Sequence, residues 1–519
     1  MPTTALMTDG PGGVKSEIVD QFSSALDDLF TAAASGSTPR SLEKELWVRL
    51  LEVARCVMAV LFALVAVRET DSDLAQRGLT LDDVKLRMDR SYWTTLMTTF
   101  GAVCFPLFAY REERPEGGTV TRTPARLGVF RLHKHCKSSE LCLEWETRLG
   151  STTPFRQAQQ LLTYFTHDAA ALEDNTIARH MVIVGSLVSR EWQYRSPEEI
   201  RKILQERATR ETGSDRPIVY ISTDAHALRR YVDDTWNAKW KMANGIRLWC
   251  VDRKTDRIIH LGGEYIWGDC YAVKAVFEEL IAAGYLPADG RYDDEVHARV
   301  VFLSDGLPWM VTHLVPLFDD AITILDAYHL LERLASHAAE FYGKGKKRAK
   351  NWYKRAALFL FPDFGKSKKK PAKKRRGPRP PKPKDISPER PPAPATDGPE
   401  NLIWHLIEMT VPKGKKMMKL HLGLLNFIGD NLFRIDYPSY RHLGYQIGSG
   451  AMESLHRVGS QMRLKLAGAR WLRETTESIF ALRMMNLVGK WDEFWAQSTL
   501  REQLPDAFAQ ASRQTQETG

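Results

Sequence analysis

The chain has few cysteines and no long hydrophobic run, and its first residues do not have the pattern expected of a leader sequence. Six cysteines are spread irregularly over 519 residues, which argues against a disulfide framework and favours a reducing compartment. The longest apolar run, residues 56–67, is too short for a bilayer, which needs about 20 residues. The first 13 residues are polar, unlike a signal peptide. We therefore expect a cytoplasmic protein without a membrane segment, in which 56–67 belongs to a buried helix.

Positive charge is concentrated in one segment. The net charge is +9, but residues 344–384 hold 18 Lys and Arg against one acid, which leaves −8 on the rest. This segment is also rich in proline and cannot bury a core. Such a stretch favours an acidic polymer as partner. Its candidate DNA contacts are Lys368, Lys369, Lys370, Lys373, Lys374, Arg375 and Arg376.

Three acids stand where α/β proteins place their sites. Asp305 follows the β-forming run 299–303, and Asp224 follows a second run, 218–223. Glu453 follows the loop Gly448-Ser-Gly450 and opens a predicted helix, with Gly450 as its N-cap. Each acid alone is more simply explained by a turn or a helix cap. Jointly they predict an acidic metal-binding triad at a sheet edge.

Three carboxylates suit phosphodiester chemistry. Two Mg²⁺ ions about 4 Å apart can activate a nucleophile and stabilise a leaving oxygen. Mg²⁺ prefers oxygen ligands, and Mn²⁺ can substitute. In this interpretation Asp224 bridges the two ions, Asp305 holds one and Glu453 holds the other.

A second acidic motif follows the next predicted strand. Asp326 and His329 lie three residues apart on an early helical turn, so they share a face. They could order the site or position a phosphate or water. A capping Asp and a packed His explain them equally well. Asp326 or Glu332 could also replace Glu453 as the third acid.

The core of the chain alternates strands and helices. Predicted strands at 217–223, 246–252 and 257–263 precede a helix, and strands at 299–304 and 321–325 are each followed by a helix. This β-β-β-α-β-α-β-α order predicts an α/β mixed sheet with helices on it. It matches the RNase H-like fold by resemblance, with a helical insertion before Glu453.

The N-terminal region is predicted to be mainly helical and to bind DNA. Helices at 154–165 and 175–188 are compatible with a helix-turn-helix that exposes Asn175, Thr176, Arg179 and His180. Any three-helix unit looks similar, so this alternative stays open. His133, His135, Cys136 and Cys142 are potential zinc ligands, but their spacing matches no common knuckle.

The expected organisation follows from these patterns. We expect a disordered tail (1–14), a helical region (15–90) that starts its second helix at Ser41, a hairpin-containing region (91–150) turning near Gly101 and a helical region (151–212). The first part of the core (213–343), a basic linker (344–400), a helical insertion (401–445), the Glu453 helix with C-terminal helices (446–500) and a loose tail (501–519) complete the chain.

Several motifs together resemble a known family. They are Ser222-Thr-Asp224, Leu303-Ser-Asp305-Gly306 with Trp309, Ile324-Leu-Asp-Ala-Tyr-His329, Gly448-Ser-Gly-Ala-Met-Glu453 and the stretch from Arg463 to Trp471. Over residues 217–475 the chain resembles bacterial DDE-class insertion-sequence transposases, particularly the ISKra-type group and its Mutator-like relatives. The resemblance implies a metal-dependent transposase that binds terminal inverted repeats, cleaves a strand and joins it to target DNA.

The resemblance also implies partners. They are double-stranded DNA at the element ends and the target, and a homodimer or larger synaptic complex associated with the bacterial nucleoid. Candidate phosphate contacts near the site are Arg457, Arg463, Lys465 and Arg470, although a solvated helix face would have the same residues. The alternatives are an RNase H-like nuclease or resolvase, a transposase-derived DNA-binding protein without catalysis, and, less favoured, a structural helical scaffold.

Overall fold

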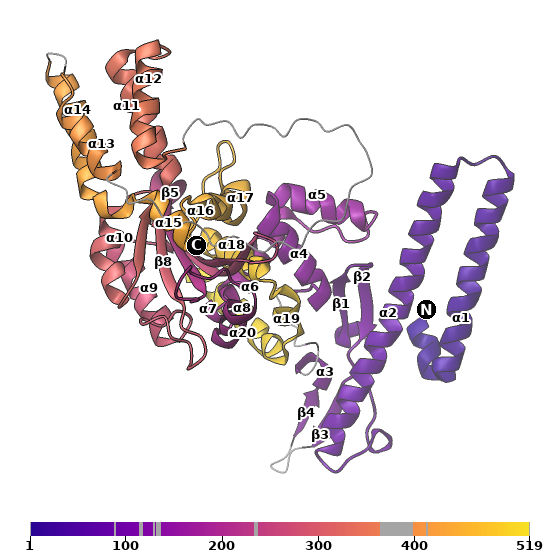
Figure 1. The fold of residues 1–519 in the computed structure, drawn as a ribbon. Coiled ribbons are helices and arrows are strands. Elements are labelled where there is room, and N and C mark those ends of the chain that lie inside the picture. Colours follow the sequence, from indigo (N-terminus) through magenta and orange to yellow (C-terminus); the bar gives the residue numbers. More distant parts are fainter. Residues whose placement is uncertain are drawn as a thin grey trace, which may run out of the picture. The chain divides into compact units, whose positions relative to one another are not determined.

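The chain forms two compact units. The computed structural model describes residues 2–87, 90–113, 118–127, 130, 136–232, 237–363, 398–411 and 414–517. The helical unit comprises Met1–Ser189 and Leu472–Gly519, and the sheet unit comprises Arg190–Trp471 (Figure 1). Residues from Leu472 on therefore belong with the N-terminal helices and not, as expected from sequence, with the helix of Glu453.

The helical unit contains two small hairpins among its helices. Its elements are α1 (Pro2–Ala34), α2 (Pro39–Ala75), β1 (Trp93–Thr98), β2 (Gly101–Pro106), β3 (Tyr110–Glu113), β4 (Thr119–Arg122), α3 (Pro124–Leu127), α4 (Glu140–Thr152), α5 (Phe155–Phe165), α6 (Asp174–Ser186), α18 (Arg473–Val488), α19 (Trp491–Ala496) and α20 (Ser498–Glu517). The predicted hairpin is confirmed: β1 and β2 pair antiparallel, and Thr98 opposes Gly101.

The two N-terminal helices are longer than expected. α1 begins at Pro2, so the predicted disordered tail is helical. α2 is capped by Thr38, whose hydroxyl accepts from the Ser41 amide, and not by Ser41, because Pro39 suits the first helical position. By length and composition α2 could span a membrane. The run 56–67 is only half-buried, since Val57, Leu61 and Leu64 are exposed.

The C-terminal helices pack onto the N-terminal ones. α18 lies so close to α6 that a Cβ on Gly185 would meet the Ser478 Cβ at 2.4 Å. The Ser478 hydroxyl donates to the Val182 carbonyl. The predicted loose tail is mostly helical as α20, with Phe508 buried. Local patterns cannot reveal such pairing, because its partners lie about 300 residues apart.

The sheet unit has one five-stranded sheet and a set of helices. Its elements are α7 (Arg190–Gln193), α8 (Pro197–Glu206), β5 (Ile218–Val232), β6 (Asn237–Val251), β7 (Ile258–Trp267), α9 (Cys270–Ala282), β8 (Arg299–Ser304), α10 (Pro308–His313), β9 (Ile322–Leu325), α11 (Ala327–Tyr342), α12 (Lys347–Leu360), α13 (Gly398–Ile407), α14 (Lys415–Asp430), α15 (Tyr437–Leu443), α16 (Gly450–Leu455), a π-helical turn (His456–Gln461) and α17 (Met462–Leu464).

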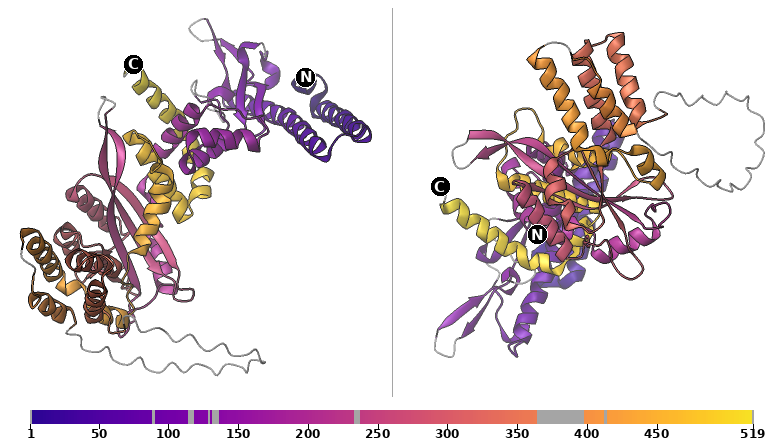
Figure 2. Two further views of the ribbon diagram at one scale, coloured as in Figure 1. Left: turned by 90° about the horizontal axis from the view of Figure 1, so that it is seen from above. Right: turned by 60° about the vertical axis from the view of Figure 1, so that its left-hand side comes forward.

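The predicted order of core elements is confirmed. The strands run β7-β6-β5-β8-β9, with β6 antiparallel to both β5 and β7, and with β8 and β9 parallel to β5. β5 and β6 are twice as long as expected, 15 residues each. The left view of Figure 2 shows them extending together as a two-stranded ribbon beyond the other strands.

Helices cover both faces of the sheet. α8, α9 and α10 pack on one face through a core that includes Val219 and Ile221, and α11–α14 pack on the other over Ile218 and Tyr220. This alternation reflects the period of two along a strand. α11–α14 stand together as a bundle (Figure 2). The prediction of a linker at 344–400 is wrong for the first part of that range, because α12 buries Trp352 and Leu360 in this core.

Candidate active site

Strand register brings three aspartates to one level of the sheet. β5 pairs with β8 through Ile221 and Phe302, and β8 pairs with β9 through Ser304 and Leu325. Continuing both registers places Asp224, Asp305 and Asp326 in one row. The side chains of Asp224 and Asp305 fall on the sheet face that α11–α14 cover. Asp224 is not at a strand end as expected, because β5 continues eight residues further and stays paired with β6 beyond the end of its pairing with β8.

Asp305 is the least satisfied member of the row. It follows β8 directly and is half-buried, and its Oδ1 is buried without a hydrogen-bond partner among the described residues. Burial raises the pKa of Asp305, and the nearby charge of Asp224 raises it further. A buried, unpartnered carboxylate oxygen costs free energy unless a cation or donor completes it.

Asp224 is held by a histidine that the sequence analysis missed. Its Oδ2 lies 3.1 Å from the His456 Nε2, and its Oδ1 accepts from the Ala225 amide at 2.7 Å. Although burial acts to raise it, the pKa of Asp224 is lowered by the hydrogen bond and charge of His456. The other ring nitrogen of His456 lies 3.1 Å from the Tyr265 hydroxyl. His456 lies three residues after Glu453, a spacing at which two helical side chains are neighbours. This spacing is the feature of the sequence from which His456 could have been predicted as a site residue.

Asp326 is fully engaged in holding the backbone. Its Oδ1 accepts from the amides of Tyr328 and His329, which caps α11, and its Oδ2 accepts from the amide and hydroxyl of Ser449. The carboxylate therefore has four donors, as many as it can accept. The capping interpretation of Asp326 is confirmed. His329 lies 3.4 Å from the same Oδ2 but remains exposed.

Glu453 lies on a short helix attached to this edge. Ser449, not Gly450, is the N-cap of α16. The preceding loop is tied down because the Ala327 amide donates to the Ile447 carbonyl, and a Cβ on Gly448 would meet the Tyr328 ring at 2.7 Å. Glu453 itself is exposed, one turn before His456.

The predicted triad is only partly gathered. Within the described ranges, no group of three or more His, Cys, Asp or Glu is placed to hold a metal ion. Asp224 and Asp305 lie close enough for the charge of Asp224 to raise the pKa of Asp305. Glu453 lies three residues before His456, the histidine that contacts Asp224.

A buried arginine also stands behind the row. Arg434 follows α14 and donates from Nη2 to the Ser304 hydroxyl at 2.8 Å, with Nη1 on the Asn431 side chain. Burial lowers its pKa, while the charge of Asp305 acts in the opposite direction. Arg434 was missed because no local motif links it to β8, 130 residues away.

Two of the predicted phosphate contacts lie beside the ribbon. The Tyr231 amide donates to the Trp471 carbonyl, and the Trp471 amide donates to the Arg229 carbonyl, so the loop of Lys465 and Arg470 runs along β5. Both side chains are exposed, as are Arg229, Lys239 and Trp240 on the ribbon. Arg457 is exposed on the π-helical turn. Arg463 differs, because it is fully buried with its guanidinium over Trp471, a contact inside the protein.

The structure describes only part of the predicted basic segment and of the potential zinc ligands. The basic residues from Lys368 to Arg376 lie outside the described residues, as do His133 and His135. Burial raises the pKa of Cys136 to about 12 and also raises that of Cys142, whose thiol contacts Glu146. Because a cysteine is reactive as the thiolate, the raised pKa values make both thiols poorly reactive.

The helix-turn-helix expectation is partly wrong. α5 and α6 exist, but eight residues separate them, more than the short turn of that motif. Asn175 and Arg179 are exposed, whereas His180 is buried and bonded to the buried Glu146. Its position on α6 faces α4, so it cannot contact a DNA groove.

Comparisons with known proteins give little further. No family model matches the chain, and no curated protein matches it. Among solved structures it is similar to the Drosophila P element transposase strand transfer complex, with 9% identity and a TM-score of 0.32, over 70% of this chain and 96% of that one. At that score no conclusion about fold or activity follows.

Proposed function

We propose that this chain is a DNA transposase that cleaves and joins DNA strands at the sheet edge of Asp224 and Asp305. The observation that carries the proposal is the buried Oδ1 of Asp305, which has no hydrogen-bond partner in the described part of the chain and lies beside a second carboxylate at the same level. Perturbed acids at the carboxyl end of a sheet are typical of catalytic sites. The strand order and the helices between β9 and α16 support the RNase H-like fold that the sequence resemblance implies.

The carboxylate pair suits Mg²⁺. This ion is commonly bound by one or two carboxylates together with substrate phosphates and water, so the pair suffices for one ion. Asp224 and Asp305 would hold it, and Glu453 would be the ligand of a second ion. When bound, the ions would activate the attacking oxygen and stabilise the leaving one. Mn²⁺ would be accepted by the same oxygen ligands.

The remaining residues orient the pair. His456 fixes the Asp224 carboxylate, and Tyr265 fixes His456 through its other ring nitrogen. Asp326 holds Ser449 and thereby the start of the helix that carries Glu453. Such supporting contacts keep ligands aimed at one place.

The ribbon offers a path for DNA. A two-stranded ribbon fits the major groove, and this one exposes Arg229, Lys239 and Trp240 beside Lys465 and Arg470. Lys239 lies opposite Arg230, which is six residues beyond Asp224 and on the same face of the ribbon, roughly 20 Å along a strand, or about six base pairs of duplex. The proposed substrates are the inverted repeats of an insertion sequence and a target duplex. The Lys368–Arg376 segment would add contacts to the DNA backbone.

A strand-transfer assay tests the proposal. The protein is incubated with Mg²⁺ or Mn²⁺, a DNA fragment carrying the sequences that flank its gene, and a plasmid target. Joined products are expected from the intact chain but not from Asp305→Asn. The matched control is Asp319→Asn, an exposed aspartate of the same unit, which should join normally.

Each other outcome points elsewhere. Cleavage without joining would replace the transposase with an RNase H-like nuclease. Binding to the ends with neither cleavage nor joining, under any divalent ion, would leave a DNA-binding protein derived from a transposase. Full joining by Asp305→Asn would refute the assignment of the site.

A further inference from the structure

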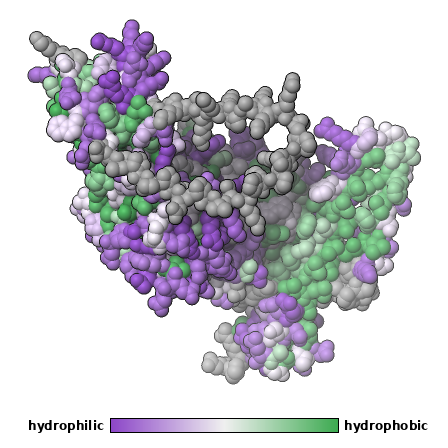
Figure 3. Space-filling model, in the orientation of Figure 1, coloured by the Kyte–Doolittle hydropathy of each residue, from purple (hydrophilic) through white to green (hydrophobic). Residues whose placement is uncertain are grey.

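One face of α2 exposes a row of large apolar side chains. Trp47, Leu50, Val57, Leu61 and Leu64 are 36–47% exposed, and half-buried Ala54 lies between them. Figure 3 shows the apolar surface over α1 and α2 as one continuous area. Soluble proteins seldom leave contiguous apolar surfaces of this kind uncovered unless they bind something.

The spacing of the row is that of a coiled-coil seam. Residues 47, 50, 54, 57, 61 and 64 follow one another at intervals of 3, 4, 3, 4 and 3. Trp47, Ala54 and Leu61 form one heptad column, and Leu50, Val57 and Leu64 form the other. Alternation of 3 and 4 keeps a stripe facing one partner helix.

The opposite face of α2 is already occupied. Val60, Ala63 and Ala66 are buried in a core with Val103 and Phe105 of β2. Arg55 donates to the Phe100 carbonyl. The exposed row therefore lies on a side of α2 that the hairpin of β1 and β2 leaves uncovered.

We propose that α2 pairs with α2 of a second copy of this chain, across a two-fold axis. The row presents on the order of 500 Å² per copy, so a pair would bury about 1,000 Å², the lower limit for a specific interface. A two-fold contact needs only a self-complementary surface, and a heptad seam is one. The proposal rests on this row alone, independently of the proposed catalysis.

The mass of the full-length protein in solution tests it, by light scattering or sedimentation across a dilution series. We expect about twice the 59.1 kDa of one chain. Leu50→Glu with Leu61→Glu should weaken the dimer about a hundred-fold or more, because charges would be buried in the seam. Leu61→Met should remain dimeric. Leu141→Glu is the matched control, since Leu141 is equally exposed on α4 of the same unit.

Circular dichroism and thermal melting should be unchanged in all variants, because the altered side chains are exposed in one chain. A monomeric wild type, or a dimer insensitive to the double substitution, would overturn the proposal. Flotation of the wild type with phosphatidylglycerol vesicles, lost in the double variant, would assign the row to a membrane surface instead.

Discussion

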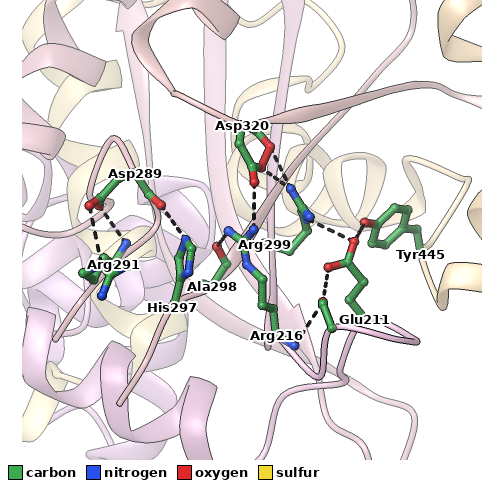
Figure 4. A network of polar contacts seen from close by, with 10 residues as sticks. Glu211, Arg216, Asp289, Arg291, His297, Ala298, Arg299, Asp320 and Tyr445 are labelled. Carbon is green, nitrogen blue, oxygen red and sulfur yellow. Dashed lines mark hydrogen bonds and ion pairs between the residues drawn. The ribbon is translucent and has the colours of Figure 1, made fainter. Parts of the chain in front are cut away.

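The two ends of the parallel strands treat their charges in opposite ways. At the amino end Arg299, the first residue of β8, binds Glu211 at 3.0 Å and also Asp320, which in turn binds Arg216 at 2.8 Å (Figure 4). Glu211 further accepts from Tyr445 and Ser214. At the carboxyl end Asp305 keeps a buried oxygen to which no described residue donates a hydrogen bond.

The pKa directions express the same difference. Burial acts to raise the pKa of Glu211 and of Asp320, but their hydrogen bonds and the charge of Arg299 outweigh it and lower both. At Asp305 burial prevails and the pKa is raised. A polar network in which every group has a partner stabilises the fold. A charged group without a partner lowers the stability, and such groups are found at functional sites. The amino end is therefore structural and the carboxyl end is the candidate site.

The largest expected effect is the separation of activity from stability at Asp305. Asp305→Asn should reduce strand joining about a thousand-fold, as loss of a metal ligand removes several kcal/mol of transition-state stabilisation. Its unfolding midpoint in urea should stay equal or rise, because a buried charge and its repulsion with Asp224 are removed. A clearly destabilised variant would make Asp305 a structural residue like Arg299.

The second effect is the converse at the other end. Arg299→Met leaves Glu211 and Asp320 without their shared cation and should lower the free energy of unfolding by about 3 kcal/mol. Joining at a temperature where the variant is folded should persist. Arg291→Met is the control, because Arg291 pairs only loosely with Asp289, at 3.9 Å between exposed side chains. Equal losses in both variants would contradict the network's role.

Asp326 differs from Asp305, because it lies at the same carboxyl end of the strands but has a hydrogen-bond donor for each of its acceptor positions. Asp326→Asn keeps one oxygen for the α11 cap but loses the acceptor for Ser449, and should cost about 1–2 kcal/mol. Joining should fall about ten-fold through displacement of α16. Ser449→Ala should have a similar effect, and the double variant should be no worse than either one. Additive losses would show that the two residues act separately.

The smallest effect is the response to acid. Because the folded pKa of Glu211 is lowered, its contribution to stability is present above the unfolded value, about 4.3, and is lost as pH falls through the folded value. Urea titrations between pH 6 and pH 3 should show a smaller loss of stability for Glu211→Gln than for the wild type. Glu206→Gln, at an exposed position, should follow the wild type. Identical curves for Glu211→Gln would refute this linkage.

Much of the sheet edge could be predicted because its signals are local. β-forming runs that end in Asp305 and at Asp326, and the order of strands and helices, are readable from short windows, and the structure has the same elements. The Gly448-Ser-Gly loop was also recognised, although its serine turned out to cap the helix and to be held by Asp326.

What the amino-acid sequence determined alone was the identity of the strands, the acids at their ends and the heptad spacing on α2, since each depends on neighbours a few residues apart. Only the tertiary structure decided that β5 continues past Asp224, that His456 and Arg434 join the site, that Arg463 and His180 are buried, and that the C-terminal helices pack with the N-terminal ones. These depend on contacts between residues far apart in the chain, whose burial and pairing no local pattern encodes.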